Sequence, residues 1–448
     1  MIKTYFKQAW NIIGQNRLFS SIYIIGTALA IAITMTLFVI YYVKIGPVYP
    51  EYNRGRTSVI KELLIEVKGK NKDGETKIFA SYNAGINRFF IPDILEKIEN
   101  VDACTATRTF YADDIAADNG KSYQGKIMVR YADPAFWKVF TFDFLCGRPF
   151  MQEDMVEPPQ SAIISSKLAE KLFASTKVAG REITIENSTY KIVGVVKSPS
   201  SFALDSYGEV FVPHKNNLNT DKPFATSTAH GMYGIYFTAK AGRYTEKISE
   251  DIDNVIKRMN VEAEDAFEKG LAGEQLSQIK EFDVKPFWKL QLDNDSAKGS
   301  MMETLQRLAL LIFSLLIVPA INLSSMISSR MEERKAEIGV RLAFGATRGS
   351  VMKQVLWENM LLTGIGGVVG LLFTIVLVYT GAEWVLTIFD QGEIFEVAQR
   401  ELNADMLMNP YIFITAFLFC MTINIASAWL PARWALKHSI ADSLNSKK

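Results

Sequence analysis

The stretch LFSSIYIIGTALAIAITMTLFVIYYV, residues 18–43, contains no Asp, Glu, Lys or Arg. A helix needs about 20 consecutive apolar residues to cross the hydrocarbon core of a bilayer, and this stretch exceeds that length. Lys3, Lys7 and Arg17 precede it, as basic residues precede the core of a signal peptide. Such a core is only about 7–15 residues long, so the sequence predicts a retained transmembrane helix instead of a cleaved leader.

Three more runs without a charged residue follow, at 308–329, 359–382 and 406–432. One charged side chain at the centre of a membrane helix costs about 2.5–3.5 kcal/mol on insertion scales. Four charge-free runs are therefore typical of a membrane protein and hard to reconcile with a soluble one. The chain has 448 residues, of which 49% are hydrophobic, and a net charge of +1 that by itself excludes no partner. We predict four transmembrane helices.

Basic residues cluster beside the predicted helix ends on one side of the membrane only. They precede the first helix, lie between the second and third, and follow the fourth: Lys3, Lys7, Arg17, Arg330, Arg334, Lys335, Arg341, Arg348, Lys353, Arg433, Lys437, Lys447 and Lys448. By contrast, residues 383–405 are rich in Asp and Glu, and Arg400 is the one basic residue among them. Loops rich in Lys and Arg stay in the cytoplasm. We therefore expect both termini inside and residues 44–307 outside.

These patterns divide the chain into nine predicted segments. In chain order they are a cytoplasmic N-terminal segment (1–17), the first helix (18–43), an extracytoplasmic domain (44–307), the second helix (308–329), a cytoplasmic coupling loop (330–353), the third helix (354–382), an extracytoplasmic loop (383–405), the fourth helix (406–432) and a cytoplasmic tail (433–448).

The predicted extracytoplasmic domain differs from the helices because charged residues and turn signals such as Asn119-Gly120 become frequent. Apolar runs typical of strands lie at 182–185, 191–197, 209–212 and 235–238. Apolar residues with helical spacing lie at 91–98, 165–173 and 248–259. This mixture predicts an α+β domain that is long enough to bury its own core.

No catalytic motif is recognisable in this domain. We interpret Asp113-Asp114 as a solvated turn and the pair Asp251 and Asp253 as the polar face of a helix. The histidines lie far apart without zinc-type spacing to a cysteine, and no basic patch indicates nucleic acid. We therefore expect no catalytic residue, no metal site and no nucleic-acid partner.

Two cysteines of the predicted extracytoplasmic domain leave two interpretations open. Cys104 and Cys146 could form a disulfide outside the cytoplasm, or both could be buried as small apolar residues. The second interpretation is favoured, because free cysteine is among the most buried residue types.

The predicted coupling loop contains SRMEERKAEIGVRLAFGATR, residues 329–348. Arg334, Ile338 and Arg341 lie on one stripe of a predicted helix, and Gly345 ends it. A short amphipathic helix between two membrane spans either rests on anionic lipid or docks into a partner protein and passes motion to the spans.

Residues 333–348 of this loop resemble the hallmark segment of FtsX-type ABC permeases. Glu358 with the glycine-rich residues 364–370, and residues 431–436, are similar to later segments of that family, although Ile440 departs from its tail pattern. In the outer domain, residues 136–150 end in Gly-Arg-Pro-Phe and are similar to the MacB-type periplasmic core. Residues 161–173 and 180–197 follow in the family's order.

The resemblance implies that residues 330–348 form a coupling helix on an ATPase. It implies that Gly345 and Ala346 form the turn into the third span. The residues it assigns to coupling with the ATPase are Glu333, Arg334, Glu337, Ile338 and Arg341. Close helix packing is expected from Gly364, Gly366, Gly367 and Gly370, with or without a dynamic role. Glu358 either snorkels to the membrane interface, which we favour, or pairs within the bundle.

The macrolide exporter of this family carries its ATPase on the same chain, whereas residues 1–448 contain no Gly-x-x-x-x-Gly-Lys-[Ser/Thr] phosphate loop. We therefore expect no cofactor on this chain, with ATP and Mg bound by a partner ABC ATPase. The resemblance further implies a dimer with a second copy or a paralogue, the bacterial inner membrane and an extracytoplasmic partner. The alternative is a membrane-anchored receptor or scaffold without an ATPase. The sequence does not identify a cargo.

Overall fold

The computed structural model describes residues 17–61, 63–70, 76–86, 98–155, 160–200, 203–214, 230–242, 245–269, 275–282, 284–290, 335–389 and 410–435, with isolated positions between 306 and 332. The chain divides into two compact units. Residues 1–42, 295–391 and 404–448 form the first, here called the helical unit, and residues 43–294 with 392–403 form the second, called the sheet unit.

The helical unit contains α2 (Arg17–Ile45, whose last residues enter the sheet unit), α9 (Lys335–Ala343), α10 (Arg348–Phe389) and α12 (Pro410–Ala435). Within the described part of the chain, two helical stretches are long and apolar enough to cross a membrane, Ser20–Val39 in α2 and Arg348–Leu377 in α10, and α12 contains a shorter apolar stretch, Phe413–Ser427. The predicted second span, residues 308–329, lies outside the described residues apart from isolated positions. The count of four spans therefore stays a prediction.

The sheet unit is built on a ten-stranded mixed sheet. Its strand order is β14 (Lys285–Pro286), β1 (Thr57–Ile60), β12 (Gly234–Ala239), β4 (Val101–Ala117), β5 (Ser122–Ala132), β10 (Val210–Pro213), β7 (Ser161–Ser165), β9 (Ser188–Val196) and β6 (Phe144–Gly147), and β8 (Glu182–Ile185) pairs with β4 and β9. A second sheet has the order β11 (His230–Gly231), β3 (Thr76–Ile86), β2 (Leu63–Lys70) and β13 (Gln275–Phe282).

Strand β4 joins two parts of the larger sheet. Its residues up to Thr107 pair with β12, and its residues from Arg108 onward pair with β5, both in antiparallel register. A single long strand thus carries two hydrophobic cores, one on each part.

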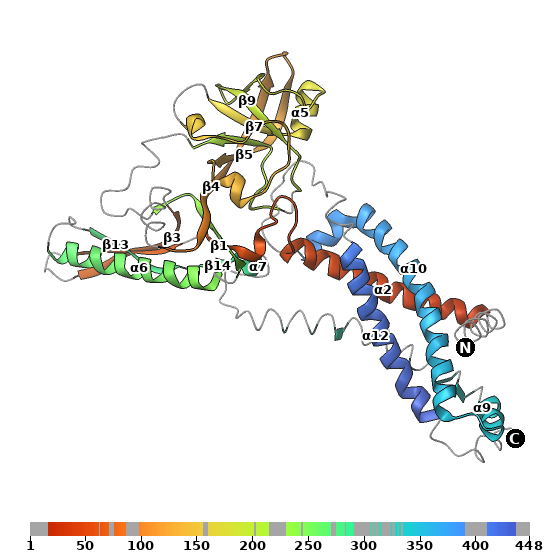
Figure 1. Ribbon diagram of the computed structural model, residues 1–448. Helices are drawn as coiled ribbons and strands as arrows, with labels where there is room; N and C mark the ends of the chain where they lie inside the picture. The colour runs from red at the N-terminus through yellow and green to blue at the C-terminus, as the bar shows by residue number, and fades with distance from the viewer. Residues whose placement is uncertain are drawn as a thin grey trace. The chain divides into compact units, whose positions relative to one another are not determined.

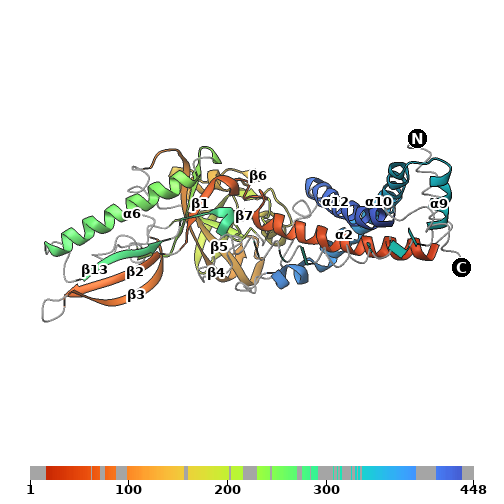
Figure 2. The same ribbon diagram turned by 90° about the horizontal axis from the view of Figure 1, so that it is seen from below.

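The first core forms where α6 (Thr245–Glu268) packs beside β13 of the smaller sheet and against the β1, β12 and β4 part of the larger sheet (Figures 1 and 2). Ile248, Ile252, Val255 and Ile256 are buried against strand residues such as Ile65. Their spacing places them on one face of a helix, which is why this charged segment forms an amphipathic helix instead of a strand.

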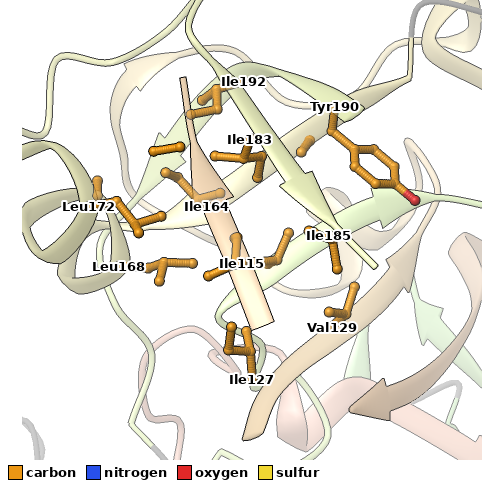
Figure 3. Packing of buried hydrophobic residues seen from close by; sticks show 14 of the residues in the cluster. Ile115, Ile127, Val129, Ile164, Leu168, Leu172, Ile183, Ile185, Tyr190 and Ile192 are labelled. Atoms are coloured by element: carbon orange, nitrogen blue, oxygen red, sulfur yellow. The ribbon is translucent and has the colours of Figure 1, made fainter. Parts of the chain in front are cut away.

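The second core lies between β4, β5, β7 to β10 and α5 (Ser166–Phe173), and Figure 3 shows its close packing. Leu168 and Leu172 of α5 point into it beside Ile164 and Ile115 (Figure 3). The side chain of Ser165 caps α5 by accepting a hydrogen bond from the backbone N–H of Leu168 at 3.4 Å.

The remaining short elements are the helices α4 (Phe136–Val139) and α7 (Phe287–Leu290) and the 3-10 turns η1 (Arg54–Arg56) and η2 (Gln152–Met155). An aromatic cluster packs around α4, in which Phe136 and Phe211 are fully buried and their ring centroids lie 5.8 Å apart.

The predicted strands at 182–185, 191–197, 209–212 and 235–238 are confirmed as β8, β9, β10 and β12. The predicted helices at 165–173 and 248–259 are confirmed as α5 and α6, whereas most of 91–98 lies outside the described residues. The mixture of helices and strands is that of an α+β unit.

The interpretation of Asp113-Asp114 as a turn is wrong. Both residues lie inside β4, exposed at a register shift between Ala112 and Asp114. The bulge lets two adjacent carboxylates face water without burying either of them. The turn follows later, at Asn119-Gly120, where Gly120 has a φ of +82°.

Cys104 and Cys146 are free in the structure, and Cys104 is buried. Cys104 packs within the first core, beneath α6, and Cys146 packs against the second core, so each acts as a small apolar side chain. Burial raises the pKa of the Cys104 thiol, which keeps it protonated and unreactive.

Candidate coupling site

Helix α9 ends in a turn that requires glycine. Gly345 has a φ of +90°, its N–H donates to the carbonyl of Leu342 at 3.1 Å, and the N–H of Ala346 donates to the carbonyl of Arg341 at 3.0 Å. These two bonds and the left-handed glycine form a Schellman motif, which satisfies the last carbonyls of the helix. The predicted helix end at Gly345 is confirmed.

The chain then starts α10 within three residues. The hydroxyl of Thr347 accepts a hydrogen bond from the N–H of Ser350 at 3.2 Å and so caps the new helix. The guanidinium of Arg341 donates to the side-chain oxygen of Gln354 at 2.7 Å, which links α9 to the first turns of α10. A displacement of α9 would therefore reach α10 through a short, hydrogen-bonded connection.

One side of α9 is anchored on the other helices of its unit. Ile338 packs against a buried cluster that includes Met331, Tyr23 of α2 and Val355 of α10. This places an apolar residue of the predicted coupling helix against a cluster to which both α2 and α10 contribute.

Another side of α9 and its turn is exposed. The side chain of Val340 is 44% exposed and that of Phe344 is 89% exposed. Phe344 lies inside the quoted Ala-Phe-Gly-Ala motif, yet sequence reasoning selected its charged and glycine neighbours and missed it. The available sequence signal is a phenylalanine directly before the glycine that ends a charged helix, but its exposure is visible only in the structure.

The other predicted coupling residues are placed only in part. Glu337 lies within α9, and Glu333 and Arg334 lie outside the described residues. Their contacts with a partner stay a prediction.

Three of the four predicted packing glycines lie where α10 approaches its neighbours. An added Cβ would overlap the side chain of Thr27 at Gly366 and the ring of Phe417 at Gly367, and at Gly370 it would come within 2.7 Å of the carbonyl oxygen of Ala28. Gly364 has no such neighbour within 4 Å. Close approach of helix backbones at small residues is typical of helix packing in membranes.

Hydrogen bonds and rings support the same packing. The hydroxyl of Thr374 in α10 donates to the carbonyl of Ala32 in α2 at 3.3 Å, and the rings of Phe38 and Phe419 lie 5.8 Å apart. Glu358 in α10 is only 4% exposed, so it is buried within the helical unit and does not extend from its surface as a snorkelling side chain would.

In the sheet unit, the Gly-Arg-Pro-Phe segment has a structural explanation. Gly147 has a φ of +76° and packs directly on the backbone of Val193 and Gly194, so no side chain fits there. Phe150 is 2% exposed within the aromatic core.

The arginine of this segment forms an ion pair. Arg148 contacts the carboxylate of Asp154 at 2.5 Å, and Ser161 donates to the same carboxylate at 2.9 Å. Burial alone would raise the pKa of Asp154, but the hydrogen bonds from Arg148, the Met151 N–H and Ser161 outweigh it and hold the pKa below its usual value. The ion pair therefore links the segment after β6 to η2 and to the start of β7.

Among the described residues, no group of three or more His, Cys, Asp or Glu side chains is arranged to hold a metal ion.

The chain matches two families of domains. The MacB-like periplasmic core domain matches residues 20–255, which is more than half of the chain, and the FtsX-like permease C-terminal domain matches residues 309–440. It is 23% identical over 389 residues to the macrolide export ATP-binding/permease protein MacB of Sodalis glossinidius, covering 83% of this chain and 51% of that protein.

It is also 26% identical over 296 residues to the ABC transporter permease YknZ of Bacillus subtilis, covering 65% of this chain and 63% of the relative. The chain thus spans about half to two thirds of the length of these relatives. Among solved structures, the periplasmic region of MacB from Actinobacillus actinomycetemcomitans aligns with 15% identity and a TM-score of 0.33, covering 56% of this chain and 98% of that one.

Apolar helices that precede and follow an α+β unit in the chain define the class as a membrane permease with a large inserted domain. The chain belongs to the MacB-like, FtsX-like family of ABC transporter permeases, and it corresponds to the permease portion of MacB-type proteins.

Proposed function

We propose that the chain is a permease subunit that transmits ATP-driven motion of a separate ABC ATPase to its sheet unit, for export or mechanotransmission. ATP and Mg bind to the partner ATPase, and the permease acts as a dimer with a second copy or a paralogue. The chain has four spans in the bacterial inner membrane, with both termini and α9 in the cytoplasm and the sheet unit outside.

The observation that carries this proposal is the geometry of α9 and its turn. One side of the helix packs through Ile338 against a cluster that includes Tyr23 of α2 and Val355 of α10, and the turn beside it exposes Phe344. A helix that is packed on one side and exposed on the other can bind a partner and transmit the partner's displacement to the membrane spans. Aromatic residues that become buried in a partner's pocket are among the typical hot spots of protein interfaces.

The test is co-purification of the full chain from mild detergent, followed by identification of a bound ATPase and measurement of its affinity and activity. We expect Phe344→Ala to weaken ATPase binding by about 30-fold or more, since truncating a central hot-spot residue costs about 2 kcal/mol or more. Glu337→Lys, which reverses a charge on α9, should weaken binding as well.

The matched control is Val261→Ala, because Val261 is 66% exposed but lies on α6 of the sheet unit. It should leave the affinity unchanged. Wild-type affinity in both Phe344→Ala and Glu337→Lys would refute the docking role of α9 and its turn. If no ATPase binds the wild-type chain at all, the receptor or scaffold function replaces the proposal.

A further inference from the structure

Arg54 heads the largest fully buried side chains among the described residues, with 2% of its surface exposed. Its guanidinium donates to the carbonyl oxygens of Val43 at 2.6 Å and Gly46 at 3.1 Å. Val43 lies in the last turn of α2, whose final carbonyls have no partner within the helix. A cation at this position also complements the negative end of the helix dipole. Arg54 therefore binds the end of the first membrane helix to the segment that follows it.

The same guanidinium forms a buried ion pair with Glu51, whose side chain is 1% exposed. The Nε and Nη2 atoms of Arg54 donate to one carboxylate oxygen of Glu51 at 2.8 Å and 2.6 Å. The other carboxylate oxygen accepts from the N–H of Ser206 at 3.0 Å and from its hydroxyl at 2.7 Å. Glu51 thus connects Arg54 to the turn 203–207, which is far away in sequence and leads into β10.

Helix α7 is the third segment that contacts Arg54, through the ring of Phe287. The guanidinium carbon lies 5.6 Å from the centre of that ring, and Phe287 is 1% exposed at the start of α7. Strand β14, just before α7, pairs with β1, just after Arg54. The chain that enters the sheet unit from α2 and the chain that leaves it after α7 are therefore held together here. We call Glu51, Arg54, Ser206 and Phe287 the Arg54 joint.

Stability alone is a weak explanation for this arrangement. Removing two charges from water is costly, and buried ion pairs can often be replaced by apolar residues without loss of stability. The turn 203–207 is already held by other groups, since Asp205 pairs with Lys61 at 2.6 Å and Arg130 donates to the carbonyls of Leu204 and Tyr207 at 2.8 Å and 2.6 Å. What the Arg54 joint adds to these contacts is a connection to the end of α2.

We infer that Arg54 is a positioning residue for coupling: it makes the end of α2, the turn 203–207 and α7 move together. A displacement of the α2 end then shifts the start of β10 and the segment that leaves the sheet unit. This inference rests on the proposed function, because the displacement is supplied by the ATPase.

The experiment uses the full chain with its ATPase in lipid nanodiscs and measures hydrogen exchange with and without ATP and vanadate. In the wild type, exchange in residues 203–214 should change on nucleotide trapping. The double variant Glu51→Gln/Arg54→Met is a neutral pair in which the introduced amide oxygen still accepts from Ser206. In it, that change should fall to less than a quarter of the wild-type value. The thermal midpoint and the basal ATPase rate should stay close to those of the wild type. Arg54→Lys should give an intermediate change.

The matched control is Lys61→Met, which breaks the other ion pair on the same turn without touching α2. It should keep the full nucleotide-dependent change. A full change in the folded double variant, or an equal loss in Lys61→Met, would overturn the inference. No change in the wild type despite ATPase binding would instead count against the proposed function, so the two failures are distinguishable.

Discussion

The two compact units keep their elements together by different physical means. The sheet unit buries charged side chains, with Glu51, Arg54, Arg130 and Asp205 all at most 4% exposed and all satisfied by hydrogen bonds. The helical unit instead brings helices together at small residues such as Gly366 and Gly370. Buried ion pairs specify one geometry, whereas small residues allow close approach without fixing a partner. The comparison teaches that the sheet unit fixes its segments through directional polar contacts, whereas close approach of backbones is the main contact at these glycines of the helical unit.

The largest effect is expected from Arg54→Met alone, which tests whether the sheet unit depends on its buried ion pair. It leaves Glu51 buried without its cation, and breaking a buried pair in this way costs about 3–5 kcal/mol. We expect the free energy of unfolding of the full chain to fall by that amount in denaturant titrations followed by intrinsic fluorescence. The double variant Glu51→Gln/Arg54→Met should recover most of it. A loss of less than about 1 kcal/mol in the single variant would show that the pair is not buried in solution.

A second test compares two glycines with positive φ. Gly147→Ala in the sheet unit should cost about 2–4 kcal/mol, because the left-handed backbone penalty and the overlap with the Val193 carbonyl add. Gly345→Ala at the α9 turn should cost only about 1–2 kcal/mol, since a Cβ there meets nothing within 4 Å. Unfolding free energies of the two variants measure the difference, and equal losses would contradict the packing at Gly147.

Within the helical unit, two glycines of α10 should respond with opposite sign. Gly370→Ala pushes α10 away from the carbonyl of Ala28, and overpacking of this kind costs about 1–3 kcal/mol. Gly364→Ala enters open space and should stabilise by up to about 1 kcal/mol through helix propensity. Thermal midpoints of the full chain in one detergent provide the measurement. A lower thermal midpoint for Gly364→Ala would contradict the open space at Gly364 and show that another element packs against it.

The sheet unit should also lose stability in acid through Asp205. Burial alone would raise the pKa of this carboxyl, but Lys61 and Tyr236 outweigh it and hold the pKa below its usual value. A carboxyl with a lower pKa in the folded state adds stability above its unfolded value of about 3.9 and loses it as the pH falls through the folded value. We expect unfolding free energies to fall below about pH 4 and Asp205→Asn to flatten that decline.

The control for this pH dependence is Asp118→Asn. Hydrogen bonds and charge from Arg181 also lower the pKa of Asp118, but the pair lies at the surface. Because surface ion pairs contribute little, this variant should keep the acid decline of the wild type. An equal flattening in both variants would mean that the buried position of Asp205 has no special effect.

The smallest effect on stability is expected at the exposed turn. Phe344→Ala should change the unfolding free energy by less than about 0.5 kcal/mol, because the side chain is 89% exposed and packs on little of its own chain. The same variant is the one expected to weaken ATPase binding most. A large loss of stability would show that Phe344 packs within the protein and is not available to a partner.

Much of the candidate coupling site was predictable because its signals are local. A glycine after an amphipathic helix marks a left-handed cap, and the structure places Gly345 in a Schellman motif. The strands and helices at 182–197 and 248–259 follow from the period of their apolar residues. The prediction of a turn at Asp113-Asp114 was wrong because a bulge within a strand has the same local composition as a turn.

The sequence by itself determined the apolar helices, the α+β character of the inserted unit and the turn after α9, since each depends on the composition or period of one continuous stretch of chain. Only the tertiary structure decided that Glu51 and Arg54 meet Ser206 and Phe287, that Phe344 is exposed, and that Gly370 but not Gly364 touches α2. These contacts join segments far apart in the chain, already 155 positions for Glu51 and Ser206, so no local pattern records them.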